Sequence, residues 1–179
     1  MTGIHPPTRG ALASLEYLGD GTVAWAQFLD LAVSSRFFRD FTRDEVEALA
    51  GFMHILRALP GLPVIQEGGS GDYMVLVLSG RVDVLKQAED GGSQLMATVG
   101  PGMTLGEMSM IDGEPRFATC LAIEPTTIAV LTRDDMTRII AERPEIGSKI
   151  LVNLVTLLSQ RLRRTSSQLL ALLPRGSRI

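Results

Sequence analysis

Cysteine is almost absent from this sequence, and its scarcity excludes several classes of site. A lone Cys120 rules out an intrachain disulfide framework, a four-cysteine zinc site and a cysteine-ligated iron–sulfur cluster. A chain without disulfides suits a reducing compartment. We therefore expect a cytoplasmic protein.

Long apolar runs are also missing. The longest one, residues 150–158, is interrupted by Asn153 and Thr156 and is far shorter than the ~18 residues that span a bilayer. The start of the chain contains Pro6 and Pro7 and has no apolar segment after a charged one, so it does not resemble a secretory signal. The sequence therefore predicts neither a membrane span nor a signal peptide.

Histidine is scarce, which limits the chemistry available. The chain has 2 histidines, and neither lies within residues 62–132. That segment also lacks a Ser–His or Cys–His pair, so metal-dependent and nucleophilic catalysis have no residues to work with there. We expect a protein that is not an enzyme and that has no metal and no cofactor.

The charge is nearly balanced overall but uneven along the chain. Lys and Arg number 17 and Asp and Glu 20, and the resulting charge of −3 argues against nonspecific nucleic-acid binding by the whole surface. Residues 143–179 carry seven basic residues and one acidic residue, so this end could contact a partner. The 179 residues, of which 45% are hydrophobic, suffice for one compact domain with a helical appendage.

The first part of the chain has the spacing of helices. Apolar side chains recur every three or four positions from residue 22 onward. Thr42 followed by Glu45 forms a capping box for a second helix, which Pro60-Gly61 ends. We predict N-terminal helices over residues 21–61 and leave residues 1–20 as an unassigned leader.

The middle of the chain, residues 62–132, has the pattern of an all-β segment. It divides into short apolar runs separated by glycine-rich turns. The candidate strands are residues 62–66, 73–78, 81–87, 94–99, 118–123 and 127–131.

Helical spacing returns after Thr132. Thr132 and Asp135 form a variant of the capping box, and the helix ends near Arg143-Pro144 because proline disfavours helix in the residue before it. A long last helix follows, so that helices are predicted over residues 133–179. Its apolar stripe comprises Ile146, Ile150, Leu151, Leu154, Leu157, Leu158 and Leu162.

Two partners for that stripe stay open. It could pack on the chain's own β segment or form the seam of a homodimer, because about two heptads are too few to establish a coiled coil. Arg161, Arg163 and Arg164 follow near the helix end, where solvated cations suit the helix dipole.

Residues 105–119 form the segment that carries chemistry. It lies between two predicted strands, has room for one short helix from Gly106 and ends with Arg116 before a strand. Helical N–H groups and an arginine fork are matched to phosphate oxygens. Glu107 would be repelled by a phosphate, which favours a neutral hydroxyl, such as that of a ribose, as its partner. A plain internal salt bridge between Arg116 and Glu107 is the structural alternative.

This segment resembles the phosphate-binding cassette of the cyclic nucleotide-binding domain family, as in catabolite activators and protein kinase regulatory subunits. The shared pattern is Gly-Glu, a short apolar helix and Pro-Arg-x-Ala-Thr, here residues 106–119. The likeness extends over roughly residues 35–165. It implies a mainly β fold with flanking helices: a jelly-roll-like β-roll (a double-stranded β-helix) with an N-terminal helical bundle and C-terminal lid helices.

The resemblance also implies roles for individual residues. Arg116 would pair with the cyclic phosphate and Glu107 with the ribose 2′-hydroxyl, while amides around Gly106, Phe117 and Ala118 complete the cradle. The expected ligand-binding residues are Gly106, Glu107, Met108, Arg116, Phe117 and Ala118.

Phe117 departs from the family pattern, which usually has Ala, Ser or Thr there. The ring could stack on the purine, turn away from the ligand or close the pocket. Without a Thr to reach guanine, cyclic AMP is the favoured ligand.

We therefore expect a regulatory cyclic nucleotide sensor that signals to a partner protein through its C-terminal helix. The alternatives are a degenerate fold with a plugged pocket acting as an interaction scaffold, or a sensor of a cyclic dinucleotide. About fourteen residues follow Thr165, too few for a helix-turn-helix, so direct DNA binding is not expected.

Overall fold

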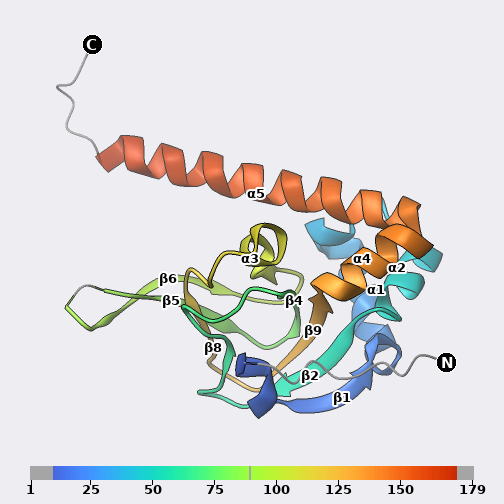
Figure 1. The fold of residues 1–179 in the computed structure, drawn as a ribbon, viewed down its shortest axis with the longest axis horizontal. Helices are drawn as coiled ribbons and strands as arrows, with labels where there is room; N and C mark the ends of the chain where they lie inside the picture. The colour runs from blue at the N-terminus through green and yellow to red at the C-terminus, as the bar shows by residue number, and fades with distance from the viewer. Residues whose placement is uncertain (1–9, 89, 173–179) are drawn as a thin grey trace.

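The chain folds into two antiparallel sheets with helices at both ends (Figure 1). The computed structural model describes residues 10–88 and 90–172. The first nine residues of the predicted leader and residues 173–179 of the predicted C-terminal segment lie outside this part.

Nine strands make up the two sheets. The five-stranded sheet has the order β1-β2-β9-β4-β7 and the four-stranded sheet the order β3-β8-β5-β6. The strands are β1 (Glu16–Asp20), β2 (His54–Ala58), β3 (Pro63–Ile65), β4 (Tyr73–Ser79), β5 (Val82–Gln87), β6 (Ser93–Val99), β7 (Thr104–Leu105), β8 (Thr119–Ala122) and β9 (Thr126–Thr132). This mainly β roll with flanking helices is the predicted fold class.

Strand β4 shows how the sheets and helices share one core. Because side chains alternate along a strand, Val75 and Val77 face the four-stranded sheet while Met74 and Leu76 face the helices. All four are fully buried. A strand buried on both faces has a continuous apolar run, as the sequence shows here.

The N-terminal region is less helical than predicted. The helix that begins after the Thr42 capping box is α2 (Arg43–Ala50), and it ends well before Pro60. Residues 54–58, predicted as helix, form β2, which pairs with β1 and β9. The prediction was wrong because β2 is buried on both faces, so its apolar run has no strand alternation. The other elements here are η1 (Gly10–Ser14), η2 (Gly21–Ala24), α1 (Trp25–Ser34) and η3 (Arg36–Phe38).

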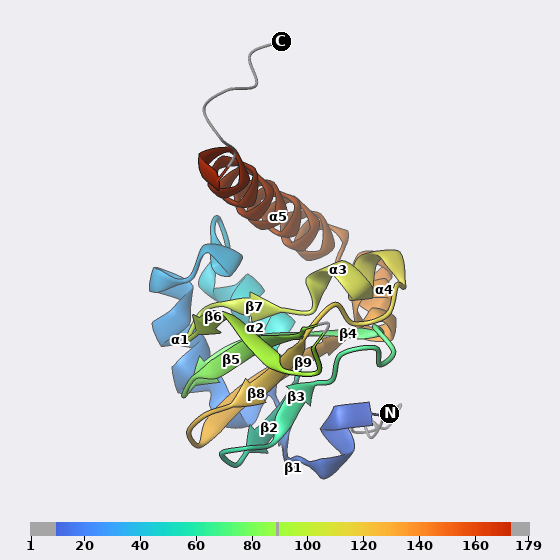
Figure 2. The same cartoon turned by 90° about the vertical axis from the view of Figure 1, so that its left-hand side faces the viewer.

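Two helices close the chain, α4 (Arg133–Glu142) and α5 (Pro144–Leu172). Figures 1 and 2 show α5 as one long helix running over the short helix α3 (Glu107–Asp112). Only its first half is anchored by buried apolar side chains, namely Ile146, Ile150 and Leu154. No described residue of α5 after Leu154 is buried. Within the described residues, none of the helices is both long and apolar enough to cross a membrane.

Candidate functional site

The cassette is built around a glycine between β7 and α3. Gly106 has φ +78°, the left-handed region that L side chains rarely adopt. A Cβ there would also lie 2.5 Å from Nη1 of Arg116 and 2.8 Å from Ile65. Glycine is therefore required both for the backbone conformation and for the close approach of the arginine.

Arg116 lies inside the protein, with only 3% of its surface exposed. Its guanidinium donates to three backbone carbonyls: Nε to Ser70 at 3.0 Å, Nη1 to Gly106 at 2.9 Å and Nη2 to Tyr73 at 2.7 Å. Burial lowers the pKa of this guanidinium from its ordinary value. The Tyr73 ring lies 4.2 Å from the guanidinium carbon and adds a cation–π contact.

These contacts leave part of the guanidinium available. An arginine has five N–H donors, and three are engaged by the carbonyls of Arg116's neighbours. Among the described residues, no carboxylate forms a salt bridge with Arg116. The arginine is thus a buried cation that no described carboxylate contacts directly, although the charge of Asp72 acts on it, and its remaining N–H groups are suited to a phosphate oxygen.

Glu107 is buried too, with 2% exposure, and its partners come from two elements. The Thr104 hydroxyl donates to one carboxylate oxygen, and Nη1 of Arg161 lies 3.0 Å from the carboxylate. Nη2 of Arg161 donates to the Thr104 carbonyl at 2.7 Å. The alternative of a salt bridge between Arg116 and Glu107 is therefore wrong for this structure, because each of the two has other partners.

Arg161 contacts the cassette, which the sequence analysis did not predict. It was expected to be a solvated cation, but it joins the second half of α5 to the cassette across 54 residues of sequence. No local pattern marks this contact, because it depends on the path of α5 over α3. Besides Arg161, one described residue of α5 beyond Leu154 forms a side-chain hydrogen bond with the rest of the protein: Gln160 accepts from Arg36.

Phe117 turns outward. Its side chain is 58% exposed, and Lys86 Nζ lies 4.6 Å above the ring while donating to the Phe117 carbonyl at 2.9 Å. The ring therefore does not fill the buried interior around Arg116, and stacking on a purine and turning away from the ligand both stay predictions. Met108 is likewise exposed on α3, whereas Ala118 is buried behind the cassette.

Two other buried titratable groups were considered from the sequence, Cys120 and His54. Burial raises the pKa of the Cys120 thiol to about 12, so this cysteine is an unreactive core residue. His54 lies in β2 and contacts Asp135 of α4 through Nε2 at 3.2 Å. Nowhere in residues 10–88 and 90–172 do three His, Cys, Asp or Glu side chains gather in a way that could hold a metal.

Comparisons with known proteins agree with this geometry. The family model for the cyclic nucleotide-binding domain matches residues 56–143. The crystal structure of a cyclic nucleotide-binding domain from Methylobacillus flagellatus KT is 37% identical, covers 96% of both chains and superposes with a TM-score of 0.82.

Two curated relatives match over a shorter part of their length. A CRP-like cAMP-activated global transcriptional regulator of Mycobacterium tuberculosis is 35% identical over 61% of this chain and 47% of its own. The cyclic AMP receptor protein of Thermus thermophilus is 30% identical over 75% of this chain and 61% of its own. The chain thus spans about half to three fifths of these relatives.

Proposed function

Because the chain belongs to the family of cyclic nucleotide-binding domains, we propose that it is a regulatory module that binds cyclic AMP at residues 105–119 and signals through α5. Family membership supports the coarser function, cyclic nucleotide binding by a regulatory domain. The choice of cyclic AMP rests on the two curated relatives, whose descriptions name that nucleotide. We assign the module a regulatory and not a catalytic role.

Arg116 is the observation that carries the proposal. A cyclic phosphate brings one negative charge and oxygens that match the N–H groups left over by the three carbonyls. Since those carbonyls fix the guanidinium in place, it needs no reorganisation to receive the ligand.

Glu107 is the proposed partner of the ribose 2′-hydroxyl. A carboxylate so close to a phosphate would weaken binding by repulsion, and Arg161 compensates that charge at 3.0 Å. An ionised carboxylate has about four lone-pair sites, so it can accept from a hydroxyl while Arg161 stays in place. Arg161 therefore favours ligand binding, and by linkage the ligand favours the docked position of α5.

The proposed output is the docking of the second half of α5. This half exposes Val155, Leu162, Leu169 and Leu170, which are 60–70% exposed and suit an apolar partner surface. The partner is another protein or a second copy of this chain, the homodimer considered from the sequence. Ligand that holds α5 on the cassette fixes where this surface is presented.

Calorimetric titration with cyclic AMP, cyclic GMP and a cyclic dinucleotide tests the proposal. We expect cyclic AMP to bind most tightly and Arg116→Lys to weaken it by about 10- to 100-fold, since lysine keeps the charge but loses the fork. The matched control is Arg81→Lys, because Arg81 is exposed and far from the cassette in sequence.

Each other outcome has a clear meaning. Tighter binding of a cyclic dinucleotide overturns the ligand assignment. If folded wild-type protein binds none of the three at about 1 mM, the sensor proposal fails and the scaffold alternative takes its place.

A further inference from the structure

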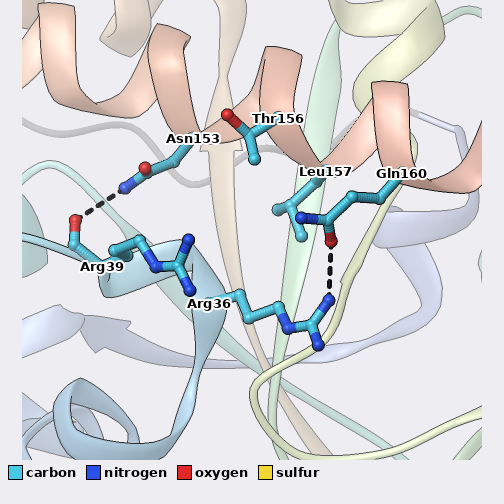
Figure 3. Close-up of a pocket in the computed structure, with 6 residues that line it drawn as sticks. All are labelled: Arg36, Arg39, Asn153, Thr156, Leu157 and Gln160. Atoms are coloured by element: carbon cyan, nitrogen blue, oxygen red, sulfur yellow. Dashed lines mark hydrogen bonds between the residues drawn. The ribbon is translucent and has the colours of Figure 1, made fainter.

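A second polar site lies under α5, at η3 and not at the cassette (Figure 3). It is a shallow hollow that is open to solvent. The residues that line it are Arg36, Arg39, Asn153, Thr156, Leu157 and Gln160.

The backbone that carries the two arginines is held firmly. Phe37 and Phe38, between them in sequence, are 0% and 1% exposed and anchor η3 in the core. From α5, the side-chain amide of Asn153, itself 7% exposed, donates to the carbonyls of Phe37 at 3.1 Å and Arg39 at 2.9 Å. The hollow is therefore bounded by two elements in a fixed relation.

The turn at η3 places the side chains of Arg36 and Arg39 on the same side of the backbone. Residues i and i+3 eclipse in a 3₁₀ turn, so Arg36 and Arg39 project from the same face of η3 toward α5 (Figure 3). Like charges on one face repel each other unless an opposite charge lies between them.

No such charge comes from the described part of the chain. Arg36 donates to the neutral side-chain oxygen of Gln160 at 2.6 Å, and neither arginine forms a salt bridge with a described carboxylate. Residues 146–172 of α5 contain no acidic residue at all. The Gln160 amide nitrogen, whose oxygen is taken by Arg36, adds a neutral donor directed at the hollow (Figure 3).

We propose that this hollow binds a phosphate group, either as inorganic phosphate or as a phosphate monoester. Two guanidinium groups match the charge of about −1.5 to −2 that a phosphate monoester carries near pH 7 better than they match a single carboxylate. A bound phosphate bridges η3 and α5 through Arg36, Arg39 and Gln160. It thereby clamps α5 one residue before Arg161, at a site independent of the cassette.

Nuclear magnetic resonance of the arginine Nε–H groups tests the site directly. Inorganic phosphate and glycerol phosphate are titrated separately, with ionic strength held constant by chloride. We expect saturable shifts of the Arg36 and Arg39 signals. Arg39→Gln should weaken binding by at least about tenfold, as expected for the loss of a charge-assisted hydrogen bond. Tighter binding of one titrant identifies the free ion or the monoester as the ligand class.

Three comparisons keep the test decisive. Arg81→Gln removes the same charge from an arginine that does not line the hollow, so it should leave the phosphate-induced shifts of Arg36 and Arg39 unchanged. Arg116→Lys changes the cassette and should also leave these shifts unchanged, which distinguishes the hollow from the cassette. Phosphate should also slow amide exchange in residues 153–160. Shifts that chloride reproduces, or that survive Arg39→Gln unchanged, would overturn the proposal whether or not a cyclic nucleotide binds.

Discussion

Replacing Arg161 by glutamine tests the link between α5 and the cassette. Glutamine is polar and unbranched to Cδ but shorter than arginine, and it removes the charge opposite Glu107 and the donor pair that contacts Glu107 at 3.0 Å and Thr104 at 2.7 Å. No described residue of α5 beyond Leu154 is fully buried, so the other attachments of this half are the half-buried residues 156–160 and the hydrogen bond from Arg36 to Gln160.

The size of the effect follows from those two hydrogen bonds. A bond to a charged group contributes about 1.5–3 kcal/mol, and the Arg161 side chain is 43% exposed, so water compensates part of the loss. We expect docking of α5 to weaken by about 2 kcal/mol, which corresponds to about 30-fold in the opening equilibrium. Because Glu107 then stands uncompensated near the phosphate position, affinity for cyclic AMP should fall as well.

Hydrogen exchange of the α5 amides measures the docking equilibrium. In Arg161→Gln, amides of residues 157–165 should exchange about 30-fold faster than in the wild type. The control is Arg163→Gln on the same helix, since Arg163 is exposed and should change exchange little. A double-mutant cycle with Glu107→Gln isolates the pair, and a coupling below about 0.5 kcal/mol would refute the reasoning.

Three further predictions concern the cassette and the buried core. Arg116→Ala deprives three carbonyls of a charged donor and should lower the free energy of unfolding in urea by at least about 3 kcal/mol; a loss under about 1 kcal/mol would contradict the buried network. Phe117→Ala should cost less than about 1 kcal/mol in the same assay and leave cyclic AMP affinity within about threefold, because the ring is exposed and does not pack in the core; binding gained only in the variant would show that the ring plugs the pocket. Burial alone would raise the pKa of Asp135, but hydrogen bonds from His54 and Thr132 lower it by more than burial raises it. The pKa of Asp135 therefore lies below its ordinary value of 3.8. The ionised Asp135 carboxylate therefore stabilises the fold fully above pH 3.8, and this stabilisation is lost as the pH falls through the lowered pKa. The urea midpoint of the wild type should drop on acidification, and that of Asp135→Asn should drop less. Equal drops would contradict the lowered pKa of Asp135.

Local signals in the sequence account for much of the fold. Thr42 and Thr132 each cap the helix that begins after them, because a hydroxyl reaching the third amide is a contact within one turn. The six candidate strands between residues 62 and 132 all have counterparts in the sheets. Three strands lacked a local signal. β1 is not buried and has two large apolar side chains, Tyr17 and Leu18, and β7 has two residues, so neither was predicted; β2, with four of its five residues buried, was predicted as helix.

The cassette illustrates the same division between local and distant information. Gly106, Glu107 and Arg116 were singled out in the sequence because residues 106–119 resemble the family's cassette, a pattern contained in one continuous segment. The contact of Arg161 with Glu107 did not, since it depends on where a helix lies after 54 intervening residues.

The sequence by itself predicted the β segment and the capped helices, because they follow from the period of apolar residues and from contacts within one helical turn; the roll and the phosphate-binding role of residues 105–119 came from the resemblance to the family. The tertiary structure decided which charges are compensated. It gave Arg116 three carbonyls, gave Glu107 the guanidinium of Arg161 and left Arg36 and Arg39 without a described carboxylate. The first assignment depends on how the turns of the roll meet around Arg116 and the second on the path of α5 across the roll, because electrostatic partners are set by proximity in space.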